Sequence, residues 1–179
     1  MKKEELRRLR LAGWPIPDEF LIELGRISAL WTSLEWMMET YIGKLAGFND
    51  LSDPKPFILL RHTSFPQKLD ILSALCEKLV PYFSNLSGYE DVVSQIRTAQ
   101  KSRNRFIHNS VGFDAETKKA TLSVGSARGT VKTSIEDIDI LDIRATSIEI
   151  HETMRNLHRL VTGKEYPSIT ETRKEQSND

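Results

Sequence analysis

The chain has little of several features that would place a protein in a functional class at once. Cys76 is its only cysteine, which excludes a disulfide framework and a zinc site built on cysteines. Because Cys76 lies within an apolar run, we expect a buried structural thiol rather than a nucleophile. No apolar run approaches the roughly 18 residues of a membrane span, so we expect no membrane partner. A phosphate-binding P-loop, a dinucleotide fingerprint and a Gly-x-Ser-x-Gly elbow are also absent from the sequence.

The sequence also lacks a complete pattern of metal ligands. His151-Glu152-Thr153-Met154-Arg155 begins like the helix of a zinc metalloprotease, but Arg155 stands where the second histidine is required. His151 and His158 are seven residues apart and share a helix face without a clear third ligand. We therefore expect no metal site and no cofactor.

An excess of charge of either sign is missing too. The chain has 25 lysine and arginine residues and 25 aspartate and glutamate residues, so its formal net charge is zero. This balance argues against a protein that coats nucleic acid non-specifically. It does not exclude a local basic site, because Arg97, Lys101, Arg103 and Arg105 cluster on one predicted helix. The charged N-terminus has no apolar region behind it, so we expect no secretory signal and a cytoplasmic protein.

At 179 residues the chain is long enough for one domain with its own hydrophobic core. The spacing of apolar residues predicts an all-α fold, a bundle of four main helices with a small β insertion before the last one. We expect a basic segment over residues 1–17, the helical domain over 18–167 and a polar, disordered tail over 168–179.

The first long helix is predicted over residues 18–45, with Asp18 as its cap. Its apolar residues recur at steps of three and four. Leu30, Trp36 and Met37 widen this apolar surface beyond one stripe. We therefore expect burial on two sides, with a helix from another chain as partner.

Capping boxes, in which a serine precedes an acidic residue or a glutamine by three, predict the other helix starts. Ser64 opens the second long helix and Ser87 the third. Residues 110–133 have β-type segments and turns, which predict a hairpin or three-stranded meander. Ser134 then caps the last helix, which Gly163 ends. Its predicted apolar stripe includes Ile138, Leu141, Ala145, Ile148, Leu157 and Val161.

The least ordinary stretch closes the third long helix, Arg103-Asn104-Arg105-Phe106-Ile107-His108-Asn109. Arg103 lies on the apolar stripe of that helix, where a guanidinium must meet a partner or a ligand because burying it unpaired is expensive. His108 lies nearby at the helix end and can titrate near neutral pH. An arginine and a histidine together could form a phosphate site with an acid or base group.

The spacing of these two residues raises a geometric problem. Five residues of ideal helix separate Arg103 and His108 by about 140°, so their side chains diverge within one chain. Fraying of the helix end could bring them together. Alternatively, two motifs could face each other across a two-fold dimer.

An arginine, an asparagine, three further residues and a histidine, late in the third long helix of a small helical domain, resemble the HEPN superfamily. The resemblance implies a HEPN-like up-and-down bundle and a metal-independent endoribonuclease that acts as a homodimer. Arg103 and His108 would then be catalytic residues in a cleft shared by two chains. HEPN proteins often carry a Leu-Glu pair in the first long helix, as Leu34-Glu35 does here, which suggests a supporting role for Glu35.

Each candidate residue also has a structural interpretation. Arg103 and His108 would suit the negative end of a helix dipole without any catalytic role. Asn104 would orient His108 or bind a backbone group. Glu35 would hold Arg103 by a charge-assisted bond or be a surface residue. Lys101, Arg105 and Arg97 are candidates for RNA binding, and would otherwise form a solvated face.

The leading prediction is therefore a metal-independent endoribonuclease, with RNA as substrate and a role in a toxin–antitoxin or defence system. The first alternative is a non-catalytic HEPN-like dimer that binds a partner or serves as a scaffold. The second is a HEPN protein paired with a nucleotidyltransferase. A partner antitoxin would belong with the endoribonuclease.

Overall fold

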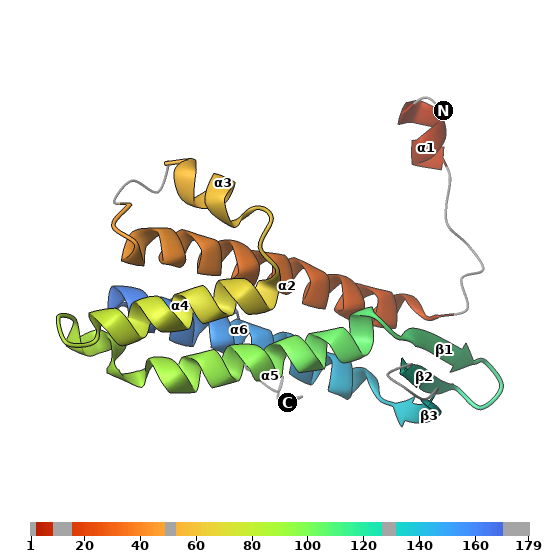
Figure 1. Cartoon of the computed structure of the whole chain (residues 1–179). Helices are drawn as coiled ribbons and strands as arrows, with labels where there is room; N and C mark the ends of the chain where they lie inside the picture. The colour runs from red at the N-terminus through yellow and green to blue at the C-terminus, as the bar shows by residue number, and fades with distance from the viewer. Residues whose placement is uncertain (1–2, 9–15, 49–52, 127–131, 170–179) are drawn as a thin grey trace, which may run out of the picture.

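The computed structural model describes residues 3–8, 16–48, 53–126 and 132–169, and it consists mainly of helices with one small antiparallel sheet (Figure 1). In chain order the elements are α1 (Lys3–Arg8), α2 (Asp18–Leu45), α3 (Lys55–Leu60), α4 (Phe65–Leu79), the 3-10 helix η1 (Ser84–Gly88), α5 (Tyr89–Ile107), β1 (Ser110–Asp114), β2 (Lys119–Ser126), β3 (Lys132–Ile138) and α6 (Ile140–Thr162). This confirms a helix-dominated chain with a small β insertion before the last helix.

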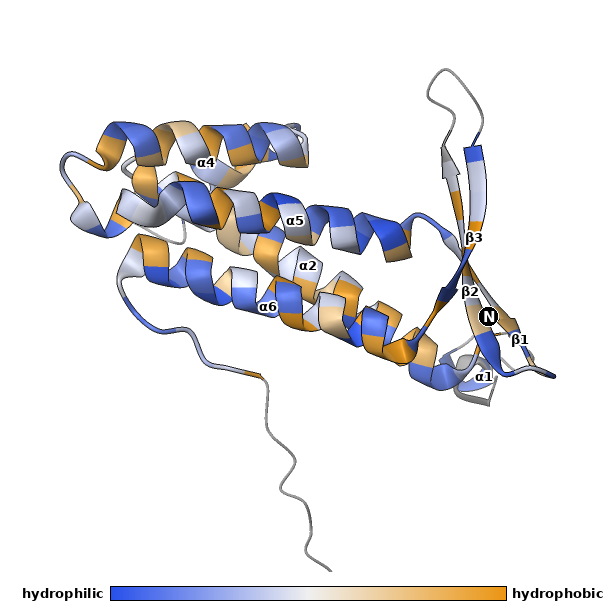
Figure 2. Cartoon of the chain, turned by 90° about the horizontal axis from the view of Figure 1, so that it is seen from below, coloured by the Kyte–Doolittle hydropathy of each residue, from blue (hydrophilic) through white to orange (hydrophobic). Residues whose placement is uncertain are grey.

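Four longer helices pack side by side, with α2 in contact with both α4 and α6, and α5 in contact with α6. Each buries one apolar side, and the sheet stands at the end of the body where α5 finishes and α6 starts (Figure 2). The fully buried aliphatic side chains of this core are Ile27, Leu34, Met38, Leu69, Leu72, Leu86, Ile96, Leu122, Ile143, Ile150 and Leu157. Burying each one contributes about 1.5–3 kcal/mol relative to an exposed position.

Helix α2 has the predicted bounds, but its predicted cap is wrong. Pro17 precedes the helix with φ −57° and ψ 147°, and Asp18 is the first helical residue. The fixed φ of proline suits a helix start, and Asp18 complements the dipole from within the first turn. Met37 is buried inside the chain, whereas Trp36 remains 64% exposed. Within this chain the apolar surface of α2 is thus covered only in part by its own neighbours, since Leu21 and Ile22 are exposed as well as Trp36.

The two predicted capping boxes ahead of α4 and α5 differ in outcome. The first is confirmed, since the Ser64 backbone N–H donates to Gln67 Oε1 at 2.8 Å. The second is wrong, because Ser87 lies inside η1 and Gly88 is the residue before α5. Leu86 is 1% exposed, and drawing it into the core requires the tight 3-10 turn at this point.

The sheet has the strand order β1-β2-β3 with both pairs antiparallel. Its inner side chains include Ala120 and Leu122, and the ring of Phe113 lies 6.2 Å from that of Phe20 on α2. The predicted insertion ended at residue 133, whereas β3 continues to Ile138. Residues 130 and 131 of the predicted third strand lie outside the described residues.

The predicted start of the last helix is therefore wrong. Ser134 lies in β3 opposite Val124, and Asp139 caps α6 by accepting the Leu141 N–H at 2.8 Å. Strand pairing with β2 keeps the segment extended, so the helix cap lies five residues later than local capping chemistry suggests. The first half of the predicted stripe is consequently out of register, since Leu141 is 60% and Ile148 44% exposed, whereas Leu157 and Val161 are buried as predicted. Ala145 is also exposed, and Ile138 belongs to β3.

Gly163 ends α6 as predicted, with a positive φ of 67° that a side chain would disfavour. Most of the predicted basic segment and of the predicted tail lies outside the described residues. In the part of the chain that the structure describes, no helix combines the length and apolar character needed to cross a membrane.

Candidate functional site

The last turn of α5 positions the predicted motif. His108 is the residue after the helix, with φ −104° and ψ 0°, and its backbone N–H still reaches the Asn104 carbonyl at 3.2 Å. The Asn109 side chain donates to the Arg105 carbonyl at 2.8 Å, which satisfies one of the last helix carbonyls. Strand β1 begins at Ser110, so the chain turns sharply immediately after the motif.

Arg103 is the centre of a local cluster. Its Nη1 donates to Asn104 Oδ1 at 3.0 Å and lies 2.8 Å from His108 Nε2. Its guanidinium carbon lies 5.7 Å from the ring centroid of Trp31 on α2, close enough for a cation–π attraction. Trp31 in turn packs on Phe65 at the start of α4, with ring centroids 4.5 Å apart. The cluster therefore joins α2, α4 and α5.

The prediction that Arg103 and His108 diverge within one chain is wrong. An ideal helix would separate them, but His108 lies just beyond α5, where the backbone is no longer constrained to helical geometry. The long, flexible arginine side chain spans the remaining distance. Contact at the end of the helix, one of the two arrangements left open by the sequence, is thus present within a single chain, and the arrangement across a two-fold dimer stays a prediction.

The contact between Arg103 and His108 also fixes the state of the imidazole. A guanidinium has only donors, so the nitrogen that it contacts must accept. Nε2 of His108 is therefore the acceptor, and the ring proton lies on Nδ1 in this arrangement. His108 is exposed and Arg103 is half-buried, so the pair lies at the boundary between core and solvent.

Asn104 and Glu35 have different partners from those predicted. Asn104 Oδ1 accepts from Arg103, so Asn104 orients the arginine rather than His108. Glu35 pairs with Lys68 of α4 at 3.0 Å, and Lys68 also pairs with Glu39 at 2.5 Å. Burial opposes the charged form of Lys68, but the hydrogen bonds to Glu39 and Glu35 outweigh it and raise the pKa of the ammonium. Glu35 thus serves the contact between α2 and α4 instead of holding Arg103.

The three further basic residues of α5 lie on its exposed side. Arg97 pairs with Asp70 at 3.2 Å, and Arg105 pairs with Glu136 of β3 at 2.9 Å. Lys101 is exposed between them. Such surface pairs are weak and can exchange for a phosphate. The arrangement supports both interpretations, a solvated face and an RNA contact.

Trp31 and Phe65 are the members of the cluster that sequence reasoning missed. Both are apolar residues at helix positions expected to face the core, so their spacing alone predicts packing and not a functional site. The available signal was Arg103 itself, because an arginine on an apolar stripe requires a neighbour that tolerates its charge. An aromatic face on a neighbouring helix meets that requirement.

The other histidines lie apart from the motif. His158 Nδ1 pairs with the Tyr41 hydroxyl at 2.5 Å, and the Tyr166 ring lies beside both His158 and His151. His151 is 1% exposed, and neither of its ring nitrogens has a hydrogen-bond partner among the described residues. Among the described residues, no three His, Cys, Asp or Glu side chains are grouped so that they could hold a metal ion.

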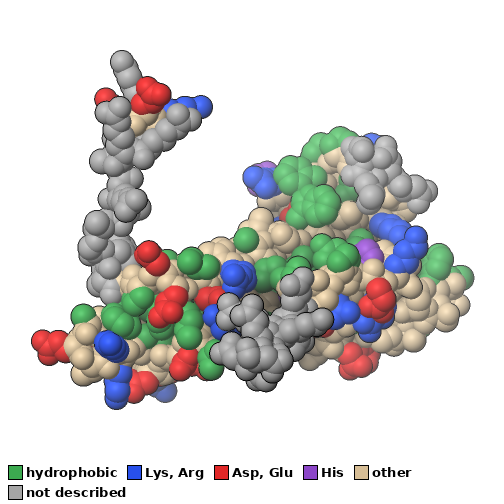
Figure 3. Space-filling model, turned by 180° about the vertical axis from the view of Figure 1, so that it is seen from behind, with side chains coloured by type: hydrophobic (Ala, Val, Ile, Leu, Met, Phe, Trp, Pro, Cys, Tyr) green, Lys and Arg blue, Asp and Glu red, His purple; other side chains and the backbone are tan. Residues whose placement is uncertain are grey.

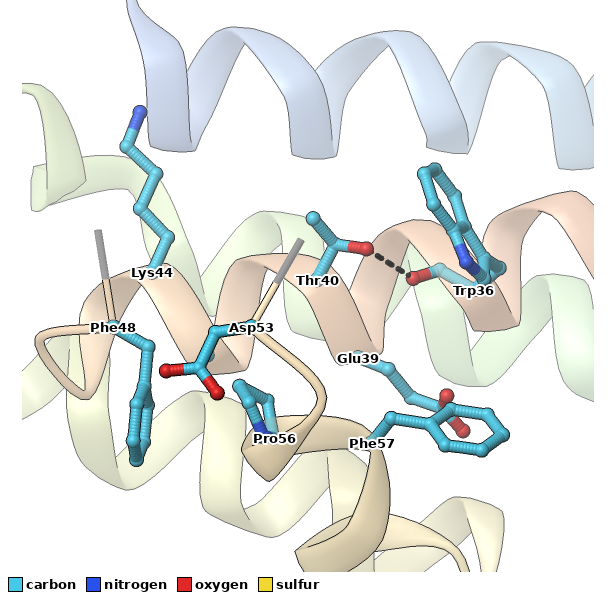
Figure 4. Close-up of a pocket in the computed structure, with 9 residues that line it drawn as sticks. Trp36, Glu39, Thr40, Lys44, Phe48, Asp53, Pro56 and Phe57 are labelled. Carbon is cyan, nitrogen blue, oxygen red and sulfur yellow. Dashed lines mark hydrogen bonds between the residues drawn. The ribbon is translucent and has the colours of Figure 1, made fainter. Parts of the chain in front are cut away.

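Two hollows of the surface also lie away from the motif. One of about 80 Å³ is bounded by Trp36, Thr40 and Lys44 of α2 and by Pro56 and Phe57 of α3 (Figure 4). A groove of about 530 Å³ runs between α2 and α6 on the other side of Trp36. Hydrophobic side chains gather over α3 and the nearby part of α2, at the upper right of Figure 3. None of the motif residues lines either hollow.

No protein-family model, curated protein or solved structure matches the chain. The residues and their geometry are therefore the basis for any assignment of function.

Proposed function

We propose that the chain is a metal-independent endoribonuclease of the HEPN type, with a HEPN-like arrangement of its four main helices, acting as a homodimer. The observation that carries the proposal is the 2.8 Å contact between Arg103 Nη1 and His108 Nε2. It brings a permanent cation beside a titratable ring, at the edge of solvent. Asn104 and Trp31 support the site by holding the guanidinium.

The reaction needs these two kinds of group. The ribose 2′-oxygen attacks the adjacent phosphorus and loses its proton to a base. The bond from phosphorus to the 5′-oxygen breaks, and that oxygen takes a proton from an acid, leaving a 2′,3′-cyclic phosphate. His108 would move a proton, and Arg103 would bind the phosphate oxygens as their negative charge grows.

The homodimer follows from the same chemistry. The attacking and leaving oxygens lie roughly in line on opposite sides of phosphorus. One imidazole on one side cannot serve both oxygens, and a second copy would supply the other proton-transfer group. A cleft shared by two chains around a two-fold axis would meet this need. We also propose that Lys101, Arg105 and Arg97 contact the RNA backbone when their acidic partners release them.

A non-catalytic HEPN-like binding or scaffold protein is the second candidate. It is favoured by the fact that Arg103, Arg97 and Arg105 all have partners within the chain. In that case the motif would stabilise the end of α5. Pairing with a nucleotidyltransferase is the other alternative, whereas an antitoxin would be the partner of the endoribonuclease.

Cleavage of a mixed-sequence single-stranded RNA in EDTA tests the proposal. We expect the wild type to cut and both His108→Ala and Arg103→Ala to lose about 100-fold or more in rate, the usual size of an acid–base contribution. Arg159→Gln, an arginine in the last turn of α6 that pairs with Glu165, is the matched control and should cut like the wild type. No cleavage by a folded, dimeric wild type would favour the binding protein, and equal cleavage by all variants would place the activity elsewhere.

A further inference from the structure

The donors of the Arg103 guanidinium are already partly used within the chain. An arginine has five N–H groups, one on Nε and two on each Nη. The two on Nη1 are directed to Asn104 Oδ1 at 3.0 Å and to His108 Nε2 at 2.8 Å. Nε is buried and has no hydrogen-bond partner among the described residues. No partner of Nη2 is found in the part of the chain that the structure describes, so its two N–H groups remain for a ligand.

This distribution restricts how Arg103 can bind an anion. Arginine binds phosphate best through two parallel hydrogen bonds from two of its nitrogens. One such edge combines Nη1 with Nη2, and the other combines Nε with Nη2. In the first edge both N–H groups of Nη1 are already used, by Asn104 and by His108, and the second edge includes the buried Nε. A phosphate thus cannot use either edge while the described arrangement persists.

We propose that the site is closed by its own histidine, and that a phosphate group opens it by displacing His108 from Arg103 Nη1. The edge shared by Nη1 and Nη2 is the one that opens, because His108 is exposed and lies beyond the end of α5. Nε is itself buried, and the guanidinium carbon lies over the ring of Trp31, which is only 6% exposed. Moving one surface imidazole disturbs less packing than exposing Nε.

The displacement would couple substrate binding to the chemistry, and in this respect the inference rests on the proposed function. While Nε2 accepts from Arg103, its lone pair cannot take the proton of a ribose hydroxyl. Once a phosphate oxygen replaces it, the same lone pair is free next to the bound phosphate. His108 would therefore become a base only where a phosphate is present. The ligand is a phosphodiester of RNA or a free phosphate, which share this chemistry.

Long-range proton–nitrogen NMR of the imidazole in 15N-labelled protein tests the inference, because it distinguishes the two tautomers. In chloride buffer slightly above neutral pH, we expect His108 to carry its proton on Nδ1, with Nε2 as acceptor. Adding inorganic phosphate, or a dinucleotide whose 2′-deoxyribose prevents cleavage, at constant ionic strength should change the Nε2 signal saturably. A response to the dinucleotide at lower concentration than to phosphate would identify a nucleic-acid phosphodiester as the ligand, and the reverse would identify free phosphate.

Three variants separate the proposed exchange from indirect effects. Arg103→Leu should abolish both the single tautomer in chloride and the response to phosphate. Arg103→Lys keeps the charge but not the paired donors, and should bind phosphate about tenfold more weakly through the loss of one charge-assisted hydrogen bond. The lysine variant also serves if the leucine variant does not fold. Arg159→Gln should behave like the wild type.

The inference is overturned by a proton on Nε2 in chloride, or by a phosphate response that persists in Arg103→Leu. It is independent of the RNA cleavage result in both directions. If the Nε2 signal of His108 responds to phosphate as expected but RNA is not cleaved, the anion site closed by His108 is kept and the nuclease is rejected. RNA cleavage by a protein whose His108 carries its proton on Nε2 would keep the nuclease and reject the closed site.

Discussion

Replacing Lys68 by methionine should destabilise the fold more than replacing any exposed basic residue of α5. Lys68 is 5% exposed, and its ammonium joins Glu35 and Glu39 of α2 to α4. Methionine keeps most of the aliphatic stem, so the loss is mainly electrostatic. The perturbation therefore isolates the ion cluster that takes the place of the predicted pair between Glu35 and Arg103.

The size of the effect follows from what is left behind. Removing one partner of a buried ion pair costs about 3–5 kcal/mol, because the other charge remains uncompensated. The Glu39 side chain is 13% exposed and would bear most of this cost, whereas that of Glu35 is 35% exposed and is partly solvated. We therefore expect a loss near the lower limit, about 3 kcal/mol. The double variant Lys68→Met with Glu39→Leu should recover most of it.

Urea unfolding followed by circular dichroism measures this loss as a shift in midpoint at constant slope. Arg97→Gln, which breaks the exposed pair with Asp70, is the control and should change stability by less than about 1 kcal/mol. A loss below about 1 kcal/mol for Lys68→Met would refute the reasoning, and so would a double variant no more stable than the single one.

The difference in unfolding free energy between wild type and Lys68→Met should depend on pH in a definite direction. The folded-state pKa of Lys68 is raised above its ordinary 10.5. The stabilisation of the folded state by the charged Lys68 is thus fully present below the unfolded-state pKa. It is lost as the pH rises through the folded-state pKa. The stability difference between wild type and Lys68→Met should stay constant through neutral pH and narrow as the pH rises into the alkaline range.

Two further predictions concern the start of α6 and the single thiol. Asp139→Ala should cost about 1 kcal/mol in urea unfolding through loss of the cap, whereas Ser134→Ala should be nearly neutral; a larger effect at Ser134 would restore the cap predicted from sequence. Burial raises the pKa of the Cys76 thiol to about 11, so Cys76 should resist a disulfide reagent such as DTNB in the native protein and react on unfolding. Rapid native labelling would contradict its placement in the core.

The helices could be predicted from the sequence to a large extent, because their apolar spacing and their glycine and proline boundaries are local signals. The bounds of α2 and the stop at Gly163 are examples. The errors arose where one local pattern fits two structures. Ser87 and Ser134 both suggest helix caps, yet the burial of Leu86 and the pairing of β3 with β2 decide otherwise.

The candidate site could be predicted in its residues but not in its contacts. Arg103 stood out because a guanidinium on an apolar stripe needs a partner, and it is indeed half-buried. Its contact with His108 forms across the end of α5, which an ideal-helix projection cannot describe. Trp31 and Lys68 meet their partners between helices distant in sequence, and these pairings depend on how the helices pack.

The most direct test of the central proposal uses an oligodeoxynucleotide that contains one ribonucleotide. We expect the wild type, in EDTA, to cut this strand once, on the 3′ side of the ribonucleotide, and to leave a 2′,3′-cyclic phosphate. His108→Ala should leave it intact, and the all-deoxy strand should resist every variant. Cleavage of the all-deoxy strand, or equal cutting by His108→Ala, would contradict a reaction in which the ribose hydroxyl attacks under the control of Arg103 and His108.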